Sequence, residues 1–141
     1  MTLKKTTGIY YTCSSPGSLM ILGEHSILRH KQGHILAIDK KVKVKLIPNL
    51  DNLNTQKIIN IKTNNSKIGN FNISYEKLND TPADQLPSSF KYALASIKYI
   101  LFNNNLNNNL LNNGFDLIID SEIPHDFGLG SSGAILTAVM G

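Results

Sequence analysis

The residues with the clearest chemical potential form a glycine- and serine-rich stretch over residues 127–134, followed directly by an apolar run over residues 135–140. Glycine lets the backbone adopt positive φ and approach a ligand closely, and Ser131 or Ser132 could cap a helix that we expect from Ala134 to Met140. The N-terminus of a helix carries unpaired N–H groups and a partial positive charge. The stretch therefore predicts a phosphate-binding loop made by Gly128, Leu129, Gly130, Ser131, Ser132 and Gly133.

The same three glycines also fit the Gly-x-Gly-x-x-Gly pattern of dinucleotide-binding proteins. That pattern expects a strand almost directly before the first glycine and an acidic residue about 20 positions further on. Here residues 121–127 separate Gly128 from the nearest predicted strand, and the sequence ends at Gly141. No Gly-Lys-Ser/Thr sequence closes a Walker loop either. A glycine-rich turn that merely starts a helix remains the structural alternative.

A second group of polar residues follows an apolar run over residues 19–22. Glu24 and His25 come directly after Gly23, and side chains at the end of a strand are often binding residues. For His25, an exposed imidazole without function is the alternative. Two further histidines, His30 and His34, have no third ligand candidate nearby, so we predict no zinc site there.

The composition of the 141 residues limits the classes of function. The net charge of +4 comes almost entirely from dispersed lysines, with Arg29 as the sole arginine, which disfavours nucleic-acid binding. No apolar run approaches the roughly 18 residues of a membrane span, and no targeting segment follows the first six residues. We therefore expect one soluble, cytoplasmic domain without membrane or nucleic-acid partners. The lone Cys13 is expected to be a small buried thiol.

Period-two and turn patterns predict several strands around these stretches. In residues 35–47 the strict alternation places Lys41, Lys43 and Lys45 on a solvent face opposite a buried apolar face. A turn is predicted at Ser14–Gly17, between two short strands, because proline and glycine favour turns. The other predicted strands cover residues 10–12, 19–22, 57–62, 70–75 and 115–120, with residues 57–62 and 70–75 forming a hairpin.

The clearest helix begins after residues 88 and 89, either of which could be its serine cap. Its apolar residues recur at three- and four-residue spacing and predict one buried face: Phe90, Leu94, Ile97 and Leu101. Residues 81–87 contain two prolines and are predicted to be a loop. The asparagine-rich residues 103–114 are predicted to be a frayed helix end and a mobile loop.

Taken together, residues 16–26, 37–39 and 124–134 resemble the motifs of the GHMP kinases, and the match is closest to the mevalonate kinases. The resemblance implies an α+β fold similar to the second domain of ribosomal protein S5, with a mixed sheet packed against helices. Residues 1–141 would be an incomplete N-terminal, ATP-binding domain, with the C-terminal domain absent. A homodimer of a full-length form is left open.

The resemblance further implies transfer of the γ-phosphoryl group of ATP to a small-molecule alcohol similar to mevalonate, with ATP and Mg²⁺ as cofactors. The glycine-rich stretch would wrap the phosphates, with the Ser132 hydroxyl on Mg²⁺. Glu24, His25 and Ser18 would lie at the substrate side, with His25 hydrogen-bonded to the acceptor. The catalytic base is not assigned and is expected beyond Gly141.

The sequence departs from the family pattern at two places. Ser18 stands where the first motif usually has lysine, and Asp126-Phe127 stands where the phosphate loop usually has Gly-Ala. These departures keep open a non-catalytic nucleotide-binding fragment or truncated-gene product. A galactokinase or a phosphomevalonate kinase also remains an alternative, because these families share the loop. The basic composition and the lysine face of residues 41–45 leave an RNA-binding protein with the S5-like fold as a third alternative.

Overall fold

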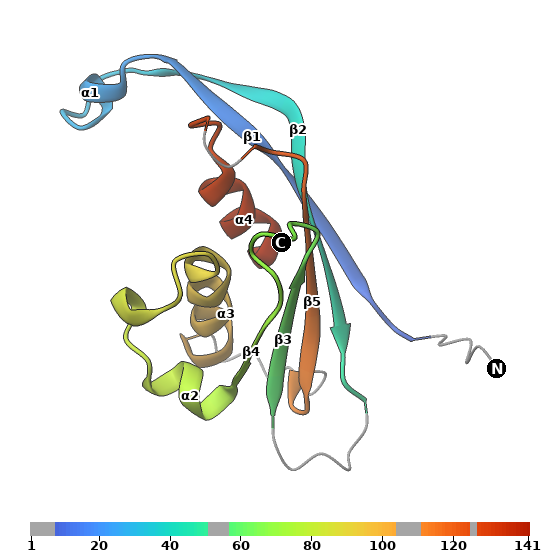
Figure 1. Ribbon diagram of the computed structural model, residues 1–141. Coiled ribbons are helices and arrows are strands. Elements are labelled where there is room, and N and C mark those ends of the chain that lie inside the picture. The colour runs from blue at the N-terminus through green and yellow to red at the C-terminus, as the bar shows by residue number, and fades with distance from the viewer. Residues whose placement is uncertain (1–7, 51–56, 104–110, 125–126) are drawn as a thin grey trace.

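The computed structural model describes residues 8–50, 57–103, 111–124 and 127–141. It contains a five-stranded mixed sheet in the order β1-β2-β5-β3-β4, with α3 and α4 packed on one face (Figure 1). The predicted α+β class is confirmed. The elements are β1 Tyr11–Leu22, α1 Glu24–Ile27, β2 His34–Pro48, β3 Ile58–Thr63, β4 Phe71–Ser74, α2 Tyr75–Asp80, the 3₁₀ helix η1 Ala83–Gln85, α3 Lys91–Asn103, β5 Gly114–Ser121 and α4 Ser131–Met140.

Antiparallel pairing dominates the sheet. β2 pairs antiparallel with both β1 and β5, β3 pairs antiparallel with β4, and only the β3–β5 contact is parallel. The hairpin predicted from residues 57–62 and 70–75 is confirmed by the β3–β4 pairing. A sheet of this kind is not the parallel, doubly wound sheet that carries the dinucleotide fingerprint. The dinucleotide alternative is therefore excluded by the fold.

The turn predicted at Ser14–Gly17 is wrong, because β1 runs through these residues as one strand. Pro16 fits there because β1 is an edge strand, where a missing backbone N–H costs little. Gly17 lies at a register shift between Pro16 and Ser18. A side chain at position 17 would place its Cβ 2.7 Å from the Leu129 carbonyl oxygen, so this glycine serves close packing and not a turn.

The core lies between the sheet and the helices α3 and α4. The predicted alternation in β2 is confirmed, since Val42 and Val44 are buried while Lys41 and Lys43 are exposed on the opposite face. The predicted face of the clearest helix is confirmed as well: Phe90, Leu94 and Ile97 are buried and Leu101 is half-buried. The uncovered face of the sheet is polar, as the lysine alternation predicts.

Three local predictions differ from the structure. The strand predicted over residues 70–75 ends at Ser74, whose side chain accepts a hydrogen bond from the Lys77 N–H and so caps the unpredicted helix α2. The loop predicted over residues 81–87 contains η1. A turn between the Pro87 carbonyl and the Phe90 N–H precedes α3, and neither candidate serine makes a capping hydrogen bond within the described residues. Of the frayed helix end and loop predicted over residues 103–114, residues 104–110 lie outside the described residues.

The end of β1, α1 and the start of β2 extend beyond the helices as an arm, defined here as residues 19–36 (Figure 1). Eight large apolar side chains of the arm are exposed: Leu19, Met20, Ile21, Leu22, Ile27, Leu28, Ile35 and Leu36. The arm is a two-stranded ribbon, which is marginally stable in water unless another layer covers it. No helix in the described part of the chain is long and apolar enough to cross a bilayer.

Candidate functional site

The predicted phosphate loop adopts the backbone conformation that its glycines allow. Gly128 and Gly130 have φ of +64° and +68°, in the left-handed region. The helix α4 begins at Ser131, with Gly130 as its N-cap. The predicted start at Ala134 and the predicted serine cap are therefore wrong, because Gly130 turns the chain directly into the helix and no side chain caps it.

This early start of α4 leaves polar groups available at the loop. The first backbone hydrogen bond of the helix runs from the Ala134 N–H to the Gly130 carbonyl, at 3.0 Å. The N–H groups of Ser131, Ser132 and Gly133 precede this bond and have no acceptor within the helix. Ser131 and Ser132 are both half-buried, and neither hydroxyl makes a capping hydrogen bond to the helix. Three N–H groups and two hydroxyls at a helix N-terminus suit a phosphate.

The space around the loop also fits an anion. A Cβ added at Gly128 or Gly133 would meet no atom within 4 Å, so the loop is open at these two residues. On its other side the loop packs against β1: a Cβ at Gly130 would overlap the Ser18 hydroxyl. The loop therefore has one supported side and one open side on which a phosphate can approach the backbone.

Ser18 is the substrate-side residue that the structure brings to the loop. Its backbone N–H donates a hydrogen bond to the Leu129 carbonyl, at 3.0 Å, and its hydroxyl faces Gly130. The side chain is half-buried, and its hydroxyl makes no hydrogen bond within the described residues. Position 18 thus borders the predicted phosphate site, although it offers a neutral hydroxyl where the family usually has a cation.

Glu24 and His25 lie elsewhere. Both are exposed in α1, at the tip of the arm and away from α4 (Figure 1). The structure does not bring either side chain into contact with the phosphate loop, because β1 continues straight to Leu22 before the chain turns at Gly23, with φ of +91°. Their assignment to the substrate side stays a prediction.

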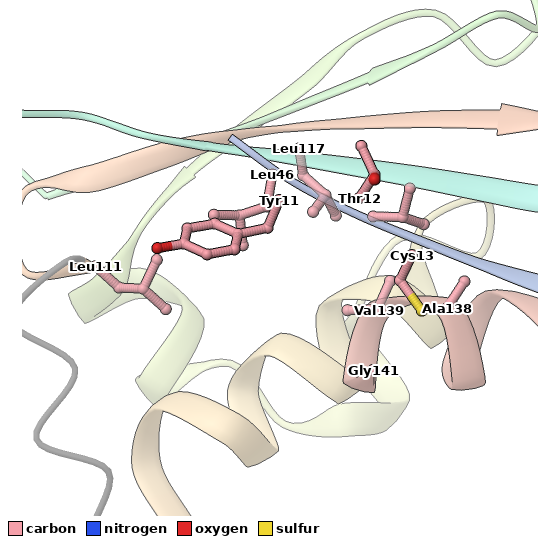
Figure 2. A pocket seen from close by; sticks show the side chains of 10 residues that line it. Tyr11, Thr12, Cys13, Leu46, Leu111, Leu117, Ala138, Val139 and Gly141 are labelled. Atoms are coloured by element: carbon pink, nitrogen blue, oxygen red, sulfur yellow. The ribbon is translucent and has the colours of Figure 1, made fainter. Parts of the chain in front are cut away.

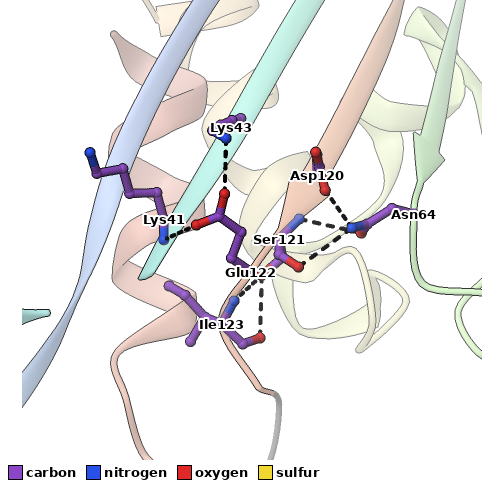
Figure 3. Close-up of polar contacts among 7 residues, drawn as sticks. All are labelled: Lys41, Lys43, Asn64, Asp120, Ser121, Glu122 and Ile123. Carbon is purple, nitrogen blue, oxygen red and sulfur yellow. Dashed lines mark hydrogen bonds and ion pairs between the residues drawn. The ribbon is translucent and has the colours of Figure 1, made fainter. Parts of the chain in front are cut away.

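Sequence reasoning missed a polar cluster where the chain leaves β5 for the phosphate loop (Figure 3). Glu122 accepts hydrogen bonds from the Lys43 Nζ at 2.9 Å and from the Lys41 backbone N–H at 3.3 Å. The Lys43 hydrogen bond, followed by the Lys41 N–H, lowers the pKa of Glu122, and the same carboxylate raises the pKa of Lys43. The lysine alternation in residues 41–45 was the available signal, but the partner lies about 80 residues away.

A comparable ion pair lies on the same polar face, between Lys62 Nζ and Asp116 Oδ2 at 2.6 Å. Asn60 donates a second hydrogen bond to the Asp116 carboxylate, at 2.8 Å. Burial opposes ionisation of Asp116, but the hydrogen bonds from Lys62 and Asn60 outweigh it and lower the pKa. Carboxylates therefore offset the lysines on this face, which weakens the case for RNA binding.

An apolar cavity of about 320 Å³ lies at the other end of α4 (Figure 2). Its lining includes Tyr11, Cys13, Leu111, Val139 and Gly141, and none of the predicted site residues. Cys13 is half-buried there and is a free thiol. The cavity is therefore separate from the phosphate loop.

The described residues contain no group of three or more histidine, cysteine, aspartate or glutamate side chains that could hold a metal. Ser132 alone supplies too few ligands for Mg²⁺, which in nucleotide sites also takes phosphate oxygens and water. Asp126, a carboxylate close to the loop in sequence, lies outside the described residues.

The C-terminal part of the chain, which holds the loop, is similar to GHMP kinase N-terminal domains. Residues 91–141, which include α3, β5, the loop and α4, match the family model described as GHMP kinases N terminal domain. This match confirms the resemblance drawn from the sequence motifs. A search of curated proteins found no match.

Solved structures extend the likeness of fold to nearly the whole chain. The Methanococcus jannaschii mevalonate kinase is 22% identical with a TM-score of 0.75, over 95% of this chain and 39% of that one. The Lactococcus lactis galactokinase, solved in complex with galactose, is 19% identical with a TM-score of 0.69, over 92% of this chain and 31% of that one. The chain thus spans less than two-fifths of these structures, and the likeness does not distinguish their substrates.

Proposed function

We propose that this chain forms the nucleotide-binding part of a GHMP-type kinase, which transfers the γ-phosphoryl group of ATP to a small-molecule hydroxyl. The observation that carries the proposal is the open, positive-φ loop at the N-terminus of α4, within the segment that matches the family. GHMP kinases use ATP, and a triphosphate is the anion that this loop would bind.

In this proposal the chain contributes binding and charge stabilisation. The N–H groups of Ser131, Ser132 and Gly133 would donate to phosphate oxygens and offset negative charge on the transferred group. Mg²⁺ bound with the nucleotide would neutralise further phosphate charge, with the Ser132 hydroxyl as its protein ligand. Ser18 would hold the loop from behind through its N–H bond to Leu129.

For the acceptor we propose a mevalonate-like alcohol, which makes mevalonate kinase the leading activity. Support comes from the sequence motifs of residues 16–26, and Glu24 and His25 would serve the acceptor from the arm. Galactose is the acceptor to compare, because a galactokinase has a similar fold. The cytoplasmic location and a homodimer of a longer form also stay proposals.

One observation favours a second candidate, a non-catalytic nucleotide-binding module. Ser18 borders the loop without a positive charge, and transfer of a phosphoryl group relies on cations to stabilise the transition state. Such a module would bind ATP through the same loop but would not release ADP.

The test is a titration followed by an assay. Calorimetry with a non-hydrolysable ATP analogue and Mg²⁺ should show binding, whereas a single-stranded RNA should bind far more weakly. Release of ADP after addition of ATP with mevalonate or with galactose then identifies a kinase and its acceptor. Because we expect residues 1–141 alone to bind without releasing ADP, the assay is repeated with a GHMP kinase C-terminal domain supplied. Release of ADP then supports the kinase, and binding without release supports the non-catalytic module. Absence of nucleotide binding would refute the proposal.

A further inference from the structure

The end of β5 has an unusual hydrogen-bond pattern. Val42 and Ser121 form the final pair of the β2–β5 ladder, and the next residues, Lys41 and Glu122, are joined by hydrogen bonds without being a ladder pair. The Glu122 N–H donates to the Lys41 carbonyl at 2.9 Å, as in a regular antiparallel ladder. The reciprocal acceptor, however, is the Glu122 carboxylate, which takes the Lys41 N–H at 3.3 Å (Figure 3).

The Glu122 carboxylate thus replaces a backbone carbonyl as the acceptor of the Lys41 N–H. The chain can leave the sheet at Glu122 while both hydrogen bonds between these two residues are kept. Lys43 fixes the carboxylate in place, with its Nζ 2.9 Å from Oε1. The Ser121 hydroxyl also accepts a hydrogen bond from the Ile123 N–H, at 3.2 Å, and so restrains the backbone directly after β5. The direction in which the chain leaves β5 is therefore set by the Glu122 carboxylate and its two donors.

From Glu122 a short series of contacts reaches the phosphate loop. The next residue, Ile123, is only 2% exposed, and its Cδ1 would lie 2.9 Å from a Cβ at Gly17. The same position of Gly17 faces the Leu129 carbonyl, which accepts the Ser18 N–H. Ile123 and Leu129 thus both pack against Gly17 of β1. The segment that leaves β5 and the phosphate loop are therefore supported by the same residue.

We infer that Glu122, held by Lys43, is a positioning residue for nucleotide binding at the phosphate loop. The inference rests on the proposed function for its ligand, but the contacts that carry it belong to the chain alone. Mutations of residues that act through such packed contacts can change the affinity of a site by about twofold to thirtyfold. Because the Lys43–Glu122 pair is exposed, part of the effect should be lost at high salt.

The experiment compares three variants with a matched control. Glu122→Ala removes both acceptors, Lys43→Ala removes the ion pair only, and Glu122→Gln keeps an oxygen for the Lys41 N–H. Asp116→Ala is the control, since it breaks an ion pair of similar exposure on the same face of the sheet, away from the loop. Affinity for the ATP analogue with Mg²⁺ is measured by calorimetry, and hydrogen exchange of the Ser18 and Ile123 amides by NMR.

We expect Glu122→Ala to weaken binding about threefold to tenfold and to speed exchange of both amides by a comparable factor. Lys43→Ala should have a smaller effect, Glu122→Gln should restore most of the amide protection, and Asp116→Ala should leave both readouts unchanged. The inference would be overturned if Glu122→Ala and the control bound the nucleotide with equal affinity and their Ser18 and Ile123 amides exchanged at equal rates. If the parent binds no nucleotide, the proposed function fails, while the exchange of Ser18 and Ile123 still decides whether Glu122 positions the loop.

Discussion

At the scale of single residues, two separate features of the structure require glycine at position 130. Its φ of +68° favours glycine, and a Cβ at this position would overlap the Ser18 hydroxyl and lie 3.1 Å from the Ser18 backbone N and O, so a side chain would have to displace Ser18. Gly128 has the first requirement but not the second, since a Cβ there would meet nothing. Within the glycine-rich stretch, Gly130 is therefore the residue whose replacement should change the loop most directly.

We predict that Gly130→Val reduces binding of the ATP analogue by at least about tenfold, because a β-branched side chain resists positive φ and would displace Ser18. Gly69→Val is the matched control, since Gly69 also has a positive φ, of +73°, but faces open space away from the loop. Calorimetry of both variants gives the comparison. Equal affinity of Gly130→Val and the parent would contradict the loop assignment.

The two loop serines allow a second prediction. If the Ser132 hydroxyl is a ligand of Mg²⁺, Ser132→Ala should weaken nucleotide binding more in the presence of Mg²⁺ than in its absence. Ser131→Ala is the control, because its hydroxyl is also half-buried in the first turn of α4. Calorimetry with Mg²⁺ and with EDTA measures both losses. Losses of the same size in the two conditions would exclude Ser132 as a metal ligand.

At the scale of elements, β1 carries the support for the site. The same strand pairs with β2 and, at Gly17 and Ser18, contacts the segment that leads into α4. Continuity of β1 through Pro16 is what brings Ser18 to Leu129. A turn at residues 14–17 would have separated the two.

We therefore predict that Gly17→Ala destabilises the fold by about 1–3 kcal/mol, since the added methyl group would overpack against the Leu129 carbonyl and Ile123. Pro16→Ala is the neighbouring control and should change the free energy of unfolding by far less, because Pro16 is exposed. Urea denaturation measures both. If the free energy of unfolding changes no more in Gly17→Ala than in Pro16→Ala, β1 and the loop can move apart to accommodate the methyl group, and the prediction is wrong.

The carboxylates of the polar face give a pH dependence. The pKa of Asp116 is lowered in the folded state, so its contribution to stability is present above its usual value of 3.8 and is lost as the pH falls through the lowered value. The urea midpoint of the parent should therefore drop between about pH 5 and pH 2 more steeply than that of Asp116→Asn. Parallel curves for the two proteins would mean that the pair with Lys62 adds nothing.

Local patterns predicted the parts of this structure that depend on local physics. Alternation identified β2, helical spacing identified α3, and the glycines identified the loop conformation. The path of β1 and the start of α4 could not be predicted in this way, because Gly17 and Gly130 are explained by atoms from distant segments. The same holds for Glu122, whose partners Lys41 and Lys43 are remote in sequence.

At the scale of the whole molecule, the arm stands out because its apolar side chains are uncovered. Leu22 and Leu28 are 64% and 79% exposed. Contiguous exposed apolar surface of this kind promotes association in water. The helical side of the sheet, in contrast, has a well-buried core.

We predict that the double substitution Leu22→Lys and Leu28→Lys lowers self-association of the chain and its binding of a hydrophobic dye, without lowering its melting temperature. The control Leu94→Ala, at a residue fully buried between the sheet and α3, should instead lower the melting temperature. Sedimentation velocity and dye fluorescence provide the measurements. Unchanged association in the double variant would assign the association to another surface.

The hydrogen-bonded contact between Lys41 and Glu122 also has a consequence for how the site is made. The hydrogen bond joins residues 81 positions apart, and the Ser18 bond to Leu129 spans more of the chain still. Contacts of such high order close long loops, which costs chain entropy and slows folding. During synthesis the loop can have no fixed shape until β5 has emerged and found β2. The capacity to bind a nucleotide should therefore appear only in the last, slow step of folding, well after the helix α3 has formed.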